Sequence, residues 1–257
     1  MSSSSPLAAR RVALLIGASG GLGQALAREL AAQDWRVALL ARRAETLQAL
    51  ADELNQRHGP DTARAYPRDV TDYDAVEPTY RAVLRDLGRL DAVIYAAGVL
   101  HPTPPEVFDF ARDREVLEVN LVAAVAWLNQ AATVFHMLGQ GHIVGVSSVA
   151  GDRGRVAMPA YHAAKAGFTT YLESLRNRLS RHGVHVLTVK PGFIDTPMLR
   201  AAQPKKLFWV AAPEQVARDI VRAMRRGKQV IYTPARWRWL MLVIQHIPSF
   251  VFRRLSF

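Results

Sequence analysis

Short apolar runs alternate with longer amphipathic stretches along most of the chain. The apolar runs are aliphatic and bounded by Gly, Asp or Pro, which is typical of strands. Six are clear and Arg64–Pro67 is weaker; the clear ones are Val12–Ile16, Arg36–Leu40, Ala92–Tyr95, His142–Val146, His185–Val189 and Val230–Tyr232. Apolar residues recur at helical spacing in Leu22–Ala32, Ala44–His58, Tyr73–Leu87, Ala111–Leu138, Ala160–His182 and Pro213–Arg225.

The apolar residues within each run are consecutive, which indicates strands that are covered on both faces. Regular alternation of strand and helix then predicts an α/β fold, with a doubly wound parallel sheet of about seven strands between two helical layers. No repeat or low-complexity linker divides the chain. We therefore expect one domain over residues 1–233 and a C-terminal amphipathic extension over residues 234–257.

Composition narrows the classes of protein further. Half of the 257 residues are apolar, which excludes a disordered chain. The chain has no cysteine, so disulfides, thiolate metal sites and a cysteine nucleophile are excluded. The Ser-rich stretch Met1–Pro6 does not have the pattern of a signal peptide, and no run of about 18 apolar residues predicts a membrane span. We expect a cytoplasmic protein.

The formal net charge of +11 is unevenly distributed. Met1 to Thr196 carries 21 Lys and Arg against 20 Asp and Glu, whereas Pro197 to Phe257 carries 12 against 2. A nucleic-acid groove needs basic residues spread along one face together with stacking aromatic residues. Because the body is nearly neutral, we expect no nucleic-acid partner and assign the positive charge to the C-terminal part.

A glycine-rich loop, Gly17–Gly23, directly follows the first predicted strand and opens the first predicted helix. Glycine permits a positive φ and lets the backbone approach a pyrophosphate, while the helix N-terminus offers free N–H groups to phosphate oxygens. An ordinary tight turn is the alternative for a bare glycine motif. The strand–loop–helix context favours a dinucleotide site.

The glycine spacing, G-x-x-x-G-x-G, resembles that of the short-chain dehydrogenase/reductase family. Further family motifs follow in order, up to about Tyr232. They are Asp69-Val70, Ala96-Ala97-Gly98, Asn120, Ser147-Ser148, Tyr161-x-x-x-Lys165 and Pro191–Pro197. The resemblance implies a Rossmann-like fold and an oxidoreductase that interconverts ketones and secondary alcohols with NADP(H) and without a metal.

Four side chains form the catalytic set that the resemblance implies. Tyr161 would protonate the carbonyl oxygen, and Ser148 would hydrogen-bond to that oxygen. Lys165 would hold the nicotinamide ribose, and Asn120 would anchor a water that resupplies protons. Because Tyr161 and Lys165 are four residues apart, they share a helical face, and we expect the ammonium group to lower the pKa of the phenol.

Two neighbouring residues could be mistaken for members of this set. The Ser-x-x-Gly pattern selects Ser148 over Ser147, so we expect Ser147 to cap or pack. His162 follows Tyr161 directly and faces away from it, so we expect a structural or substrate-facing role.

The resemblance also implies a set of cofactor contacts, drawn from each motif. They are Gly17, Ser19, Gly20, Gly21, Leu22, Gly23, Arg42, Arg43, Asp69, Val70, Ala96, Ala97, Gly98, Tyr161, Lys165, Pro191, Gly192, Ile194 and Thr196. The chain departs from the family pattern at two places. Ile16 replaces the usual Thr, and Tyr95-Ala96 stands where two Asn are frequent, so another contact must fix the central strand there.

The end of the second predicted strand bears on the choice of nicotinamide. NAD selection needs a carboxylate there to accept the ribose hydroxyls, and the sequence Ala41-Arg42-Arg43 offers none before Glu45. The guanidinium groups of Arg42 and Arg43 suit a 2′-phosphate, to which Ser19 can add a hydroxyl. We expect NADPH to be preferred, although an arginine pair after a strand can also be a solvated turn.

The segment after Gly192 covers the substrate in this family. Here it contains an apolar wall with two cations, formed by Met198, Leu199, Leu207, Phe208 and Trp209 around Lys205-Lys206. This composition fits a lipid-like or partly anionic substrate, and equally a packed loop with a solvated tip.

The extension carries Trp and Arg beside a short apolar stretch, which is typical of an interfacial helix. We expect peripheral membrane contact through Arg236–Phe257, at the inner face of the membrane. The alternative is a helix that packs on the sheet or in a dimer interface.

The extension and the Ser147–Arg155 stretch together resemble the branch of the family that contains decaprenylphosphoryl-2-keto-ribose reductase. That likeness implies a lipid-linked keto-sugar substrate. A 3-ketosphinganine-type ketone or a broad range of carbonyls is the second choice. An NADP-sensing binding protein is the non-enzyme alternative, which the retained Tyr161 and Lys165 disfavour. The family resemblance implies a homodimer or homotetramer.

Overall fold

Seven parallel strands form one sheet in the order β3-β2-β1-β4-β5-β6-β7 in the computed structural model, which describes residues 10–202 and 207–255. The strands are β1 (Val12–Ile16), β2 (Arg36–Ala41), β3 (Ala63–Pro67), β4 (Ala92–Tyr95), β5 (Gly141–Val146), β6 (Val184–Pro191) and β7 (Val230–Thr233). All five residues of β1 are fully buried, which agrees with a strand covered on both faces. The predicted sheet is confirmed, including the weak third strand.

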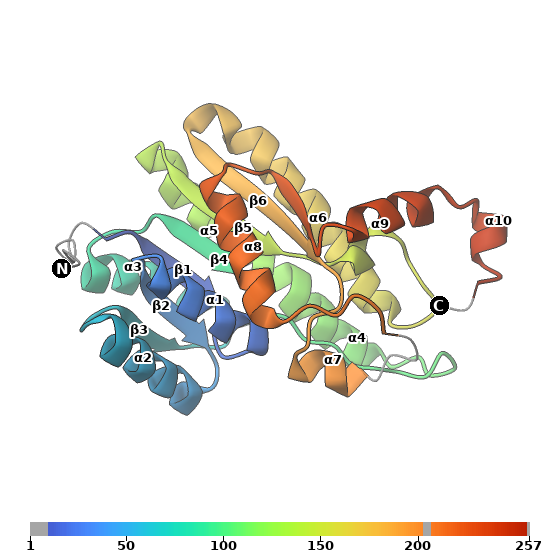
Figure 1. The fold of residues 1–257 in the computed structure, drawn as a ribbon, viewed down its shortest axis with the longest axis horizontal. Coiled ribbons are helices and arrows are strands. Elements are labelled where there is room, and N and C mark those ends of the chain that lie inside the picture. Colours follow the sequence, from blue (N-terminus) through green and yellow to red (C-terminus); the bar gives the residue numbers. More distant parts are fainter. Residues whose placement is uncertain (1–9, 203–206, 256–257) are drawn as a thin grey trace.

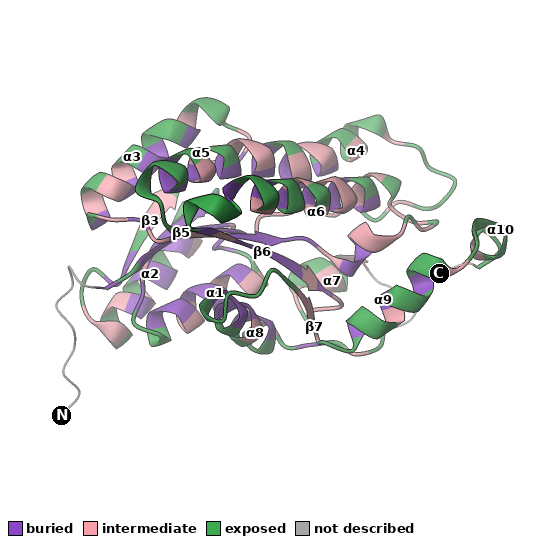
Figure 2. Ribbon diagram, turned by 90° about the horizontal axis from the view of Figure 1, so that it is seen from above, coloured by how far each residue is buried: buried purple, intermediate pink, exposed green. Residues whose placement is uncertain are grey.

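Helices cover both faces of the sheet (Figure 2). On one face lie α1 (Gly21–Ala32), α2 (Ala44–His58) and α8 (Pro213–Arg225). On the other lie α3 (Val76–Leu87), α5 (Ala123–Leu138) and α6 (Pro159–Leu179). Short elements complete the chain: η2 (Tyr73–Ala75), α4 (Phe110–Leu117), η3 (Glu118–Val122), η4 (Val149–Asp152), η5 (Ser180–His182) and α7 (Pro197–Ala202). This is the expected Rossmann-like, three-layer α/β arrangement.

The helix predicted over Ala111–Leu138 is not uniform. It begins at Phe110 and passes through the π-helical segment η3, which contains the buried Asn120, before α5 continues. Within the described residues, this run is the single helix whose length and composition would allow it to cross a membrane. Trp127, Leu128 and Phe135 of α5 are fully buried against the sheet, so the run is a core helix of this fold.

The C-terminal extension follows β7 and forms α9 (Trp237–His246) and α10 (Ser249–Phe252). Both helices lie at one end of the molecule, beyond the sheet (Figure 1). Trp237 is 2% exposed, so it is a core residue and not the interfacial anchor that its neighbourhood in the sequence suggested. Ser256 and Phe257 of the predicted contact segment, and Lys205-Lys206 of the predicted substrate wall, lie outside the described residues.

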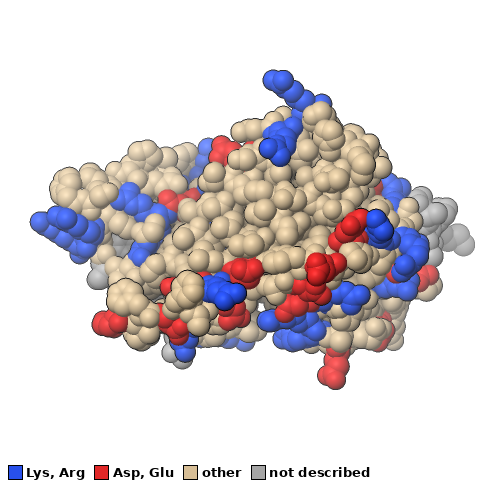
Figure 3. Space-filling view, turned by 180° about the vertical axis from the view of Figure 1, so that it is seen from behind, with Lys and Arg blue, Asp and Glu red and all other residues tan. Residues whose placement is uncertain are grey.

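Charged side chains are sparse on one large face. Figure 3 shows the outer side of the layer that contains α3, α5 and α6, and a broad area across its middle carries neither Lys and Arg nor Asp and Glu. On this side α5 presents partly or fully exposed small and polar residues such as Ala126 and Asn129.

Candidate active site

The predicted site residues gather at the carboxyl ends of the central strands. Gly17 follows β1, Gly98 follows β4, Ser148 follows β5 and Gly192 follows β6, and all of these strands are parallel. The strand order reverses beside β1, and ligands of doubly wound sheets bind at such a switch point.

The first and last residues of the loop must be glycine, because other backbone atoms lie where a Cβ atom would be. Gly17 has a φ of +96°, and a Cβ atom there would lie 2.4 Å from the backbone nitrogen of Ala97. A Cβ at Gly23 would lie 2.1 Å from the carbonyl oxygen of Gly17. Both distances are too short for any side chain, so these two glycines allow the loop and the start of α1 to pack closely against the neighbouring backbone.

The middle of the loop is open instead. A Cβ at Gly20 would be 3.7 Å from its nearest neighbour, and the residue is exposed. Gly20 is the N-cap of α1, no side chain caps it, and the first turn holds no acidic residue. Free N–H groups and the positive end of the helix dipole therefore face the open side of the loop, which fits a pyrophosphate. Leu22 packs on the core below.

The arginine pair lies at the rim of this loop. Arg43 donates to the carbonyl oxygen of Ser19 at 2.6 Å and to its hydroxyl at 3.2 Å. Arg42 is 3.6 Å from a carboxylate oxygen of Asp69, and its side chain is 62% exposed. The rim thus presents two cations and a hydroxyl, as a 2′-phosphate would require.

Asp69 is held in place by its own turn. Its carboxylate accepts hydrogen bonds from the backbone N–H and hydroxyl of Thr71 at 2.9 and 2.8 Å. Burial raises the pKa of Asp69, but these bonds and Arg42 outweigh it and lower the pKa overall. The neighbouring Val70 is buried, and its carbonyl accepts from the indole of Trp127 at 2.9 Å.

The structure brings Ser148, Tyr161 and Lys165 together. The Ser148 hydroxyl hydrogen-bonds the Tyr161 phenol and accepts from the backbone N–H of Ala150 at 3.0 Å. The Lys165 Nζ lies 5.7 Å from the centre of the Tyr161 ring and donates to the carbonyl of Val146 at 3.1 Å. Ser148 follows β5 and caps η4, while the other two share a face of α6, so the sheet and one helix fix all three.

The pKa directions in this cluster correct one expectation. Burial raises the pKa of Tyr161, and the opposing influence is the hydrogen bond from Ser148, not the charge of Lys165. Burial also lowers the pKa of Lys165 to about 8, so its positive charge is itself disfavoured. The predicted lowering of the phenol pKa by the ammonium group is therefore not seen in this arrangement.

Asn120 lies in the π-helical segment. Its Nδ2 donates to the carbonyls of Val99 and Val116, both at 2.8 Å, and its Oδ1 is buried without a partner among the described residues. A Cβ at Gly98 would be 2.7 Å from that Oδ1 and 3.8 Å from the Lys165 Nζ. Glycine at position 98 thus lets the Asn120 amide and the Lys165 ammonium group approach the same stretch of backbone.

The contact that replaces the missing asparagine next to Ala96 is made by Tyr95. Its side chain is fully buried, and its hydroxyl donates to the carbonyl of Val119 at 2.6 Å. This bond ties β4 to the helix beside Asn120. This role of Tyr95 was not predicted from the sequence, although a tyrosine at the end of a buried strand is a signal for such a bond.

Ser147 and His162 have structural roles, as expected. The Ser147 hydroxyl donates to the carbonyl of Lys165 at 2.9 Å and contacts the hydroxyl of Thr169 at 2.8 Å. The buried His162 ring bonds the carbonyl of Ala150 through Nδ1 at 2.7 Å.

The segment after β6 closes the site from the other side. Ile194 pairs with Ala211 and packs on the core, and the Thr196 methyl group would be 3.1 Å from a Cβ at Gly21. A Cβ at Gly192 would lie only 1.9 Å from the Nε1 of Trp237, so the indole of α9 covers the backbone after Pro191. This role of Trp237 could not be predicted from the sequence, because the fold alone brings α9 back to β6.

Phe208 and Trp209 belong to an aromatic cluster with Phe193 and Trp237. The ring centres of Phe208 and Trp237 are 5.1 Å apart and the rings are stacked, while Trp209 meets Trp237 edge-on at 5.6 Å. These two members of the predicted substrate wall therefore pack on the extension. Leu207 and Met198 stay exposed.

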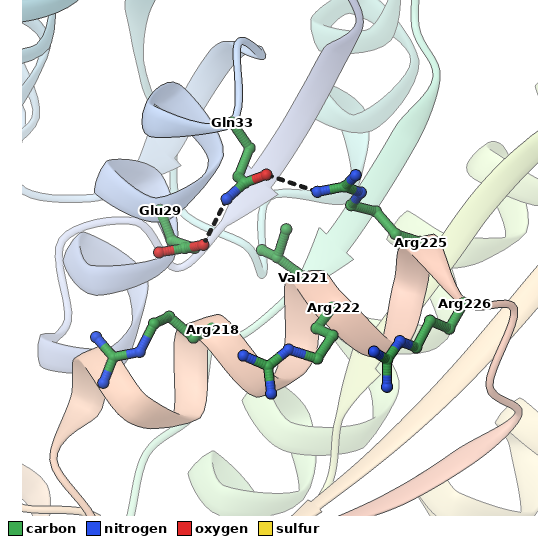
Figure 4. Close-up of a pocket in the computed structure, with 7 residues that line it drawn as sticks. All are labelled: Glu29, Gln33, Arg218, Val221, Arg222, Arg225 and Arg226. Atoms are coloured by element: carbon green, nitrogen blue, oxygen red, sulfur yellow. Dashed lines mark hydrogen bonds between the residues drawn. The ribbon is translucent and has the colours of Figure 1, made fainter.

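Two hollows on the surface of the described part bear on the position of the site. One, of about 570 Å³, lies between Asp69, Thr71 and the helix around Glu118, with Arg42 at its edge, and so belongs to the cofactor side of the site. The other, of about 420 Å³, lies between α1 and α8 (Figure 4) and is lined by Glu29, Gln33, Val221, three arginines of α8 and Arg226, which follows that helix. It contains none of the predicted site residues and is a solvated groove between two helices.

Comparison with known proteins identifies the family. The family model described as short chain dehydrogenase matches residues 11–207. An uncharacterized oxidoreductase of Myxococcus xanthus is 40% identical over 188 residues, which cover 73% of this chain and 74% of the relative. An uncharacterized oxidoreductase of Mycobacterium tuberculosis is 36% identical over 236 residues, covering 91% and 92%.

Among solved structures, levodione reductase superposes with a TM-score of 0.77 at 25% identity, covering 86% of this chain and 95% of that one. The chain belongs to the short-chain dehydrogenase/reductase family, whose members are oxidoreductases that use NAD(P)(H).

Proposed function

We propose that this protein is an NADP(H)-dependent reductase that converts a ketone to a secondary alcohol, and that its substrate is lipid-like or lipid-linked. The observation that carries the reaction is the Ser148–Tyr161–Lys165 cluster at the carboxyl ends of the strands. The reductase named among the structural relatives supports the same direction.

The residues that would hold the cofactor fit it. Gly17 and Gly23 shape the loop, the uncapped turn at Gly20 faces the phosphates, and Arg42 and Arg43 lie at the rim. When bound, the nicotinamide supplies a hydride to the carbonyl carbon.

The chain's own side chains supply the rest. Ser148 donates a hydrogen bond to the carbonyl oxygen and orients it, and Tyr161 transfers its proton to that oxygen as the alcohol forms. A phenol is protonated at neutral pH, and burial raises the pKa of Tyr161 further, so the side chain is in the form that donates a proton. The partnerless Oδ1 of Asn120 supplies the acceptor for a water that returns a proton through Lys165.

The test is a panel of ketones offered with NADPH, followed by the loss of reduced nicotinamide, in the native protein and in Tyr161→Phe. We expect Tyr161→Phe to lower kcat by about 10²–10⁴-fold while cofactor binding, measured by nicotinamide fluorescence, is retained. If the native protein binds NADPH but reduces no ketone in the panel, the NADP-sensing alternative gains support. If Tyr161→Phe reduces ketones at the native rate, the catalytic assignment is wrong.

Nucleotide preference is a separate test. We expect NADPH to exceed NADH in kcat/KM, and Arg43→Ala to reduce that preference by about tenfold, since one charge-assisted hydrogen bond is lost. Arg57→Ala, an exposed arginine at the far end of α2, is the matched control and should leave the preference unchanged. Equal use of NADH and NADPH by the native protein would contradict the proposal.

The lipid-like character of the substrate rests on the resemblance to the branch that contains decaprenylphosphoryl-2-keto-ribose reductase and on the exposed apolar residues beside the site. Val156, Met198 and Leu207 are 54%, 38% and 53% exposed. A 3-ketosphinganine-type ketone is the second candidate. Comparing long-chain with short-chain ketones of the same head group separates a lipid reductase from a broad-specificity one.

A further inference from the structure

The C-terminal helices have two apolar faces, and only one of them is covered. Trp237, Met241 and Ile244 of α9 are 2%, 0% and 7% exposed and form a small core with Val149. They recur at spacings of four and three residues, which place them on one side of the helix. Through this covered side the extension packs on the rest of the protein.

The extension also contacts the loop between the catalytic serine and tyrosine, through two arginines of that loop. Arg153 donates to the carbonyl of Gln245 at 2.7 Å, and its guanidinium lies 4.4 Å from the centre of the Phe252 ring. Arg155 lies within 3.8 Å of the Met241 sulfur. The helices are therefore held in one orientation beside the site.

The outer side of the extension is exposed and apolar. On α9, Trp239, Leu242 and Val243 are 67%, 48% and 64% exposed. The apolar surface continues over α10 and to Leu255, three residues beyond it, with Phe250, Val251 and Leu255 at 61%, 39% and 36% exposed. We define these six residues as the outer face.

The charges around the outer face have one sign. Arg236, Arg238, Arg253 and Arg254 flank it and are all exposed, and no acidic residue follows Asp219 in the sequence. A second copy docked on this face by two-fold symmetry would bring the same arginines opposite one another without a carboxylate from either extension. Charge complementarity thus favours an anionic partner.

We propose that the outer face docks on an anionic lipid surface. Trp239, Leu242, Val243 and Phe250 would enter the headgroup–acyl boundary, while the four arginines contact lipid phosphates, as in interfacial amphipathic helices. Since α9 follows the carboxyl end of β7, this face lies at the same end of the sheet as the active site (Figure 1). Docking would hold the exposed Val156 and Leu207 near the lipid.

The proposal is tested by flotation of the full-length protein with vesicles of phosphatidylcholine alone and of phosphatidylcholine with a quarter phosphatidylglycerol. We expect binding to the anionic vesicles, weakened by added salt. Trp239→Ser/Val243→Ser should reduce the partition coefficient at least about tenfold. Val230→Ser, the same change at a 44%-exposed valine at the start of β7, should leave it unchanged.

A second pair of variants tests the charge. Arg238→Gln/Arg254→Gln should reduce binding to anionic vesicles by about tenfold or more. Arg222→Gln/Arg226→Gln removes the same charge from α8 and the residue that follows it, and should have little effect (Figure 4). Folding of each variant is checked by thermal denaturation.

Two results would overturn the proposal. The first is equal flotation of the native protein and Trp239→Ser/Val243→Ser. The second is no flotation of the native protein together with a lower molecular mass for Trp239→Ser/Val243→Ser in light scattering, which would show that the face joins two copies of the chain. Neither readout depends on the enzymatic activity.

Discussion

Two adjacent serines at the end of β5 have opposite surroundings. The Ser147 hydroxyl points into the helix layer and bonds the carbonyl of Lys165, whereas the Ser148 hydroxyl meets Tyr161. Replacing either serine by alanine removes one hydroxyl. Comparing the two variants therefore distinguishes a hydroxyl that stabilises the fold from one that takes part in catalysis.

We expect Ser148→Ala to lower kcat by about 10²-fold, because one donor to the carbonyl oxygen is lost, with little change in Tm. Ser147→Ala should instead cost about 1 kcal/mol of unfolding free energy and leave kcat within a few-fold of the native value. Steady-state kinetics and denaturant unfolding on both variants check this. The reverse pattern would reassign the two serines.

Some properties of single residues in the site could be predicted from the sequence, and others could not. Ser148, Tyr161 and Lys165 were selected by spacing, and spacing suffices because one helix turn and one strand end fix their positions. The predicted direction of the Tyr161 pKa was wrong, since burial raises it and only the Ser148 hydrogen bond opposes burial. Sequence does not reveal how deeply the phenol and the Lys165 ammonium group are buried. The Tyr95 bond depends on how β4 meets η3, which is a tertiary contact.

A buried ion pair joins three elements behind the catalytic loop. Lys190 of β6 is 2.5 Å from Asp152 of η4, with side chains 11% and 1% exposed, and the Tyr232 hydroxyl of β7 donates to the same carboxylate at 2.9 Å. Because the carboxylate is almost fully buried, Lys190→Met should cost about 3–5 kcal/mol of unfolding free energy.

Denaturant unfolding measures that loss. Lys190→Met/Asp152→Asn should recover part of it, since no uncompensated charge is then buried. Arg200→Met, which breaks an exposed pair with Asp195, is the control and should change stability by less than about 1 kcal/mol. A similar small loss for Lys190→Met would contradict the argument.

The β5–β6 pairing contains a histidine pair that should respond to pH. His142 and His185 lie opposite each other, with Nδ1 atoms 3.3 Å apart. Burial, and then the neighbouring His185 and Arg11, lower the pKa of His142 from 6.5 to about 4. Between these values the unfolded chain binds more protons than the folded one, so stability is complete above pH 6.5 and decreases as the pH falls toward 4.

A shift of this size corresponds to about 3 kcal/mol, and partial exposure of the ring reduces our expectation to about 2 kcal/mol. Denaturant unfolding at several pH values checks it. In His142→Gln the total loss of stability between pH 6.5 and 4 should be smaller by that amount. An unchanged slope would show that other groups cause the acid sensitivity.

At the level of elements, the sequence predicted every strand of the sheet and the six main helices, because each carries a clear period. It did not predict η4 or α7, which are short and lack a period, nor the π-helical turn at Asn120. The orientation of α9 was left open, since its sequence has apolar residues on two sides. Only the fold decides that Trp237 packs against Gly192 while Trp239 is exposed.

At the level of the whole molecule, the uneven charge of the sequence is matched by an uneven surface. The positive excess lies in the C-terminal quarter, where four of its arginines flank the outer face, and the layer of α3, α5 and α6 presents a broad uncharged area (Figure 3). An uncharged area of this kind is a candidate for self-association. The family resemblance implies a homodimer or homotetramer through the two long helices, α5 and α6.

We expect light scattering coupled to size exclusion to give the mass of a dimer or tetramer for the native protein. Ala126→Arg, in the middle of the outer side of α5, places a charge in that area and should shift the mass toward the monomer. Ala49→Arg makes the same change at an exposed position of α2, on the opposite layer, and should leave the mass unchanged. A monomeric native protein, or an Ala126→Arg variant of unchanged mass, would exclude this face as the interface. Since α5 continues from the segment that holds Asn120, loss of the interface should also lower kcat if association stabilises that segment.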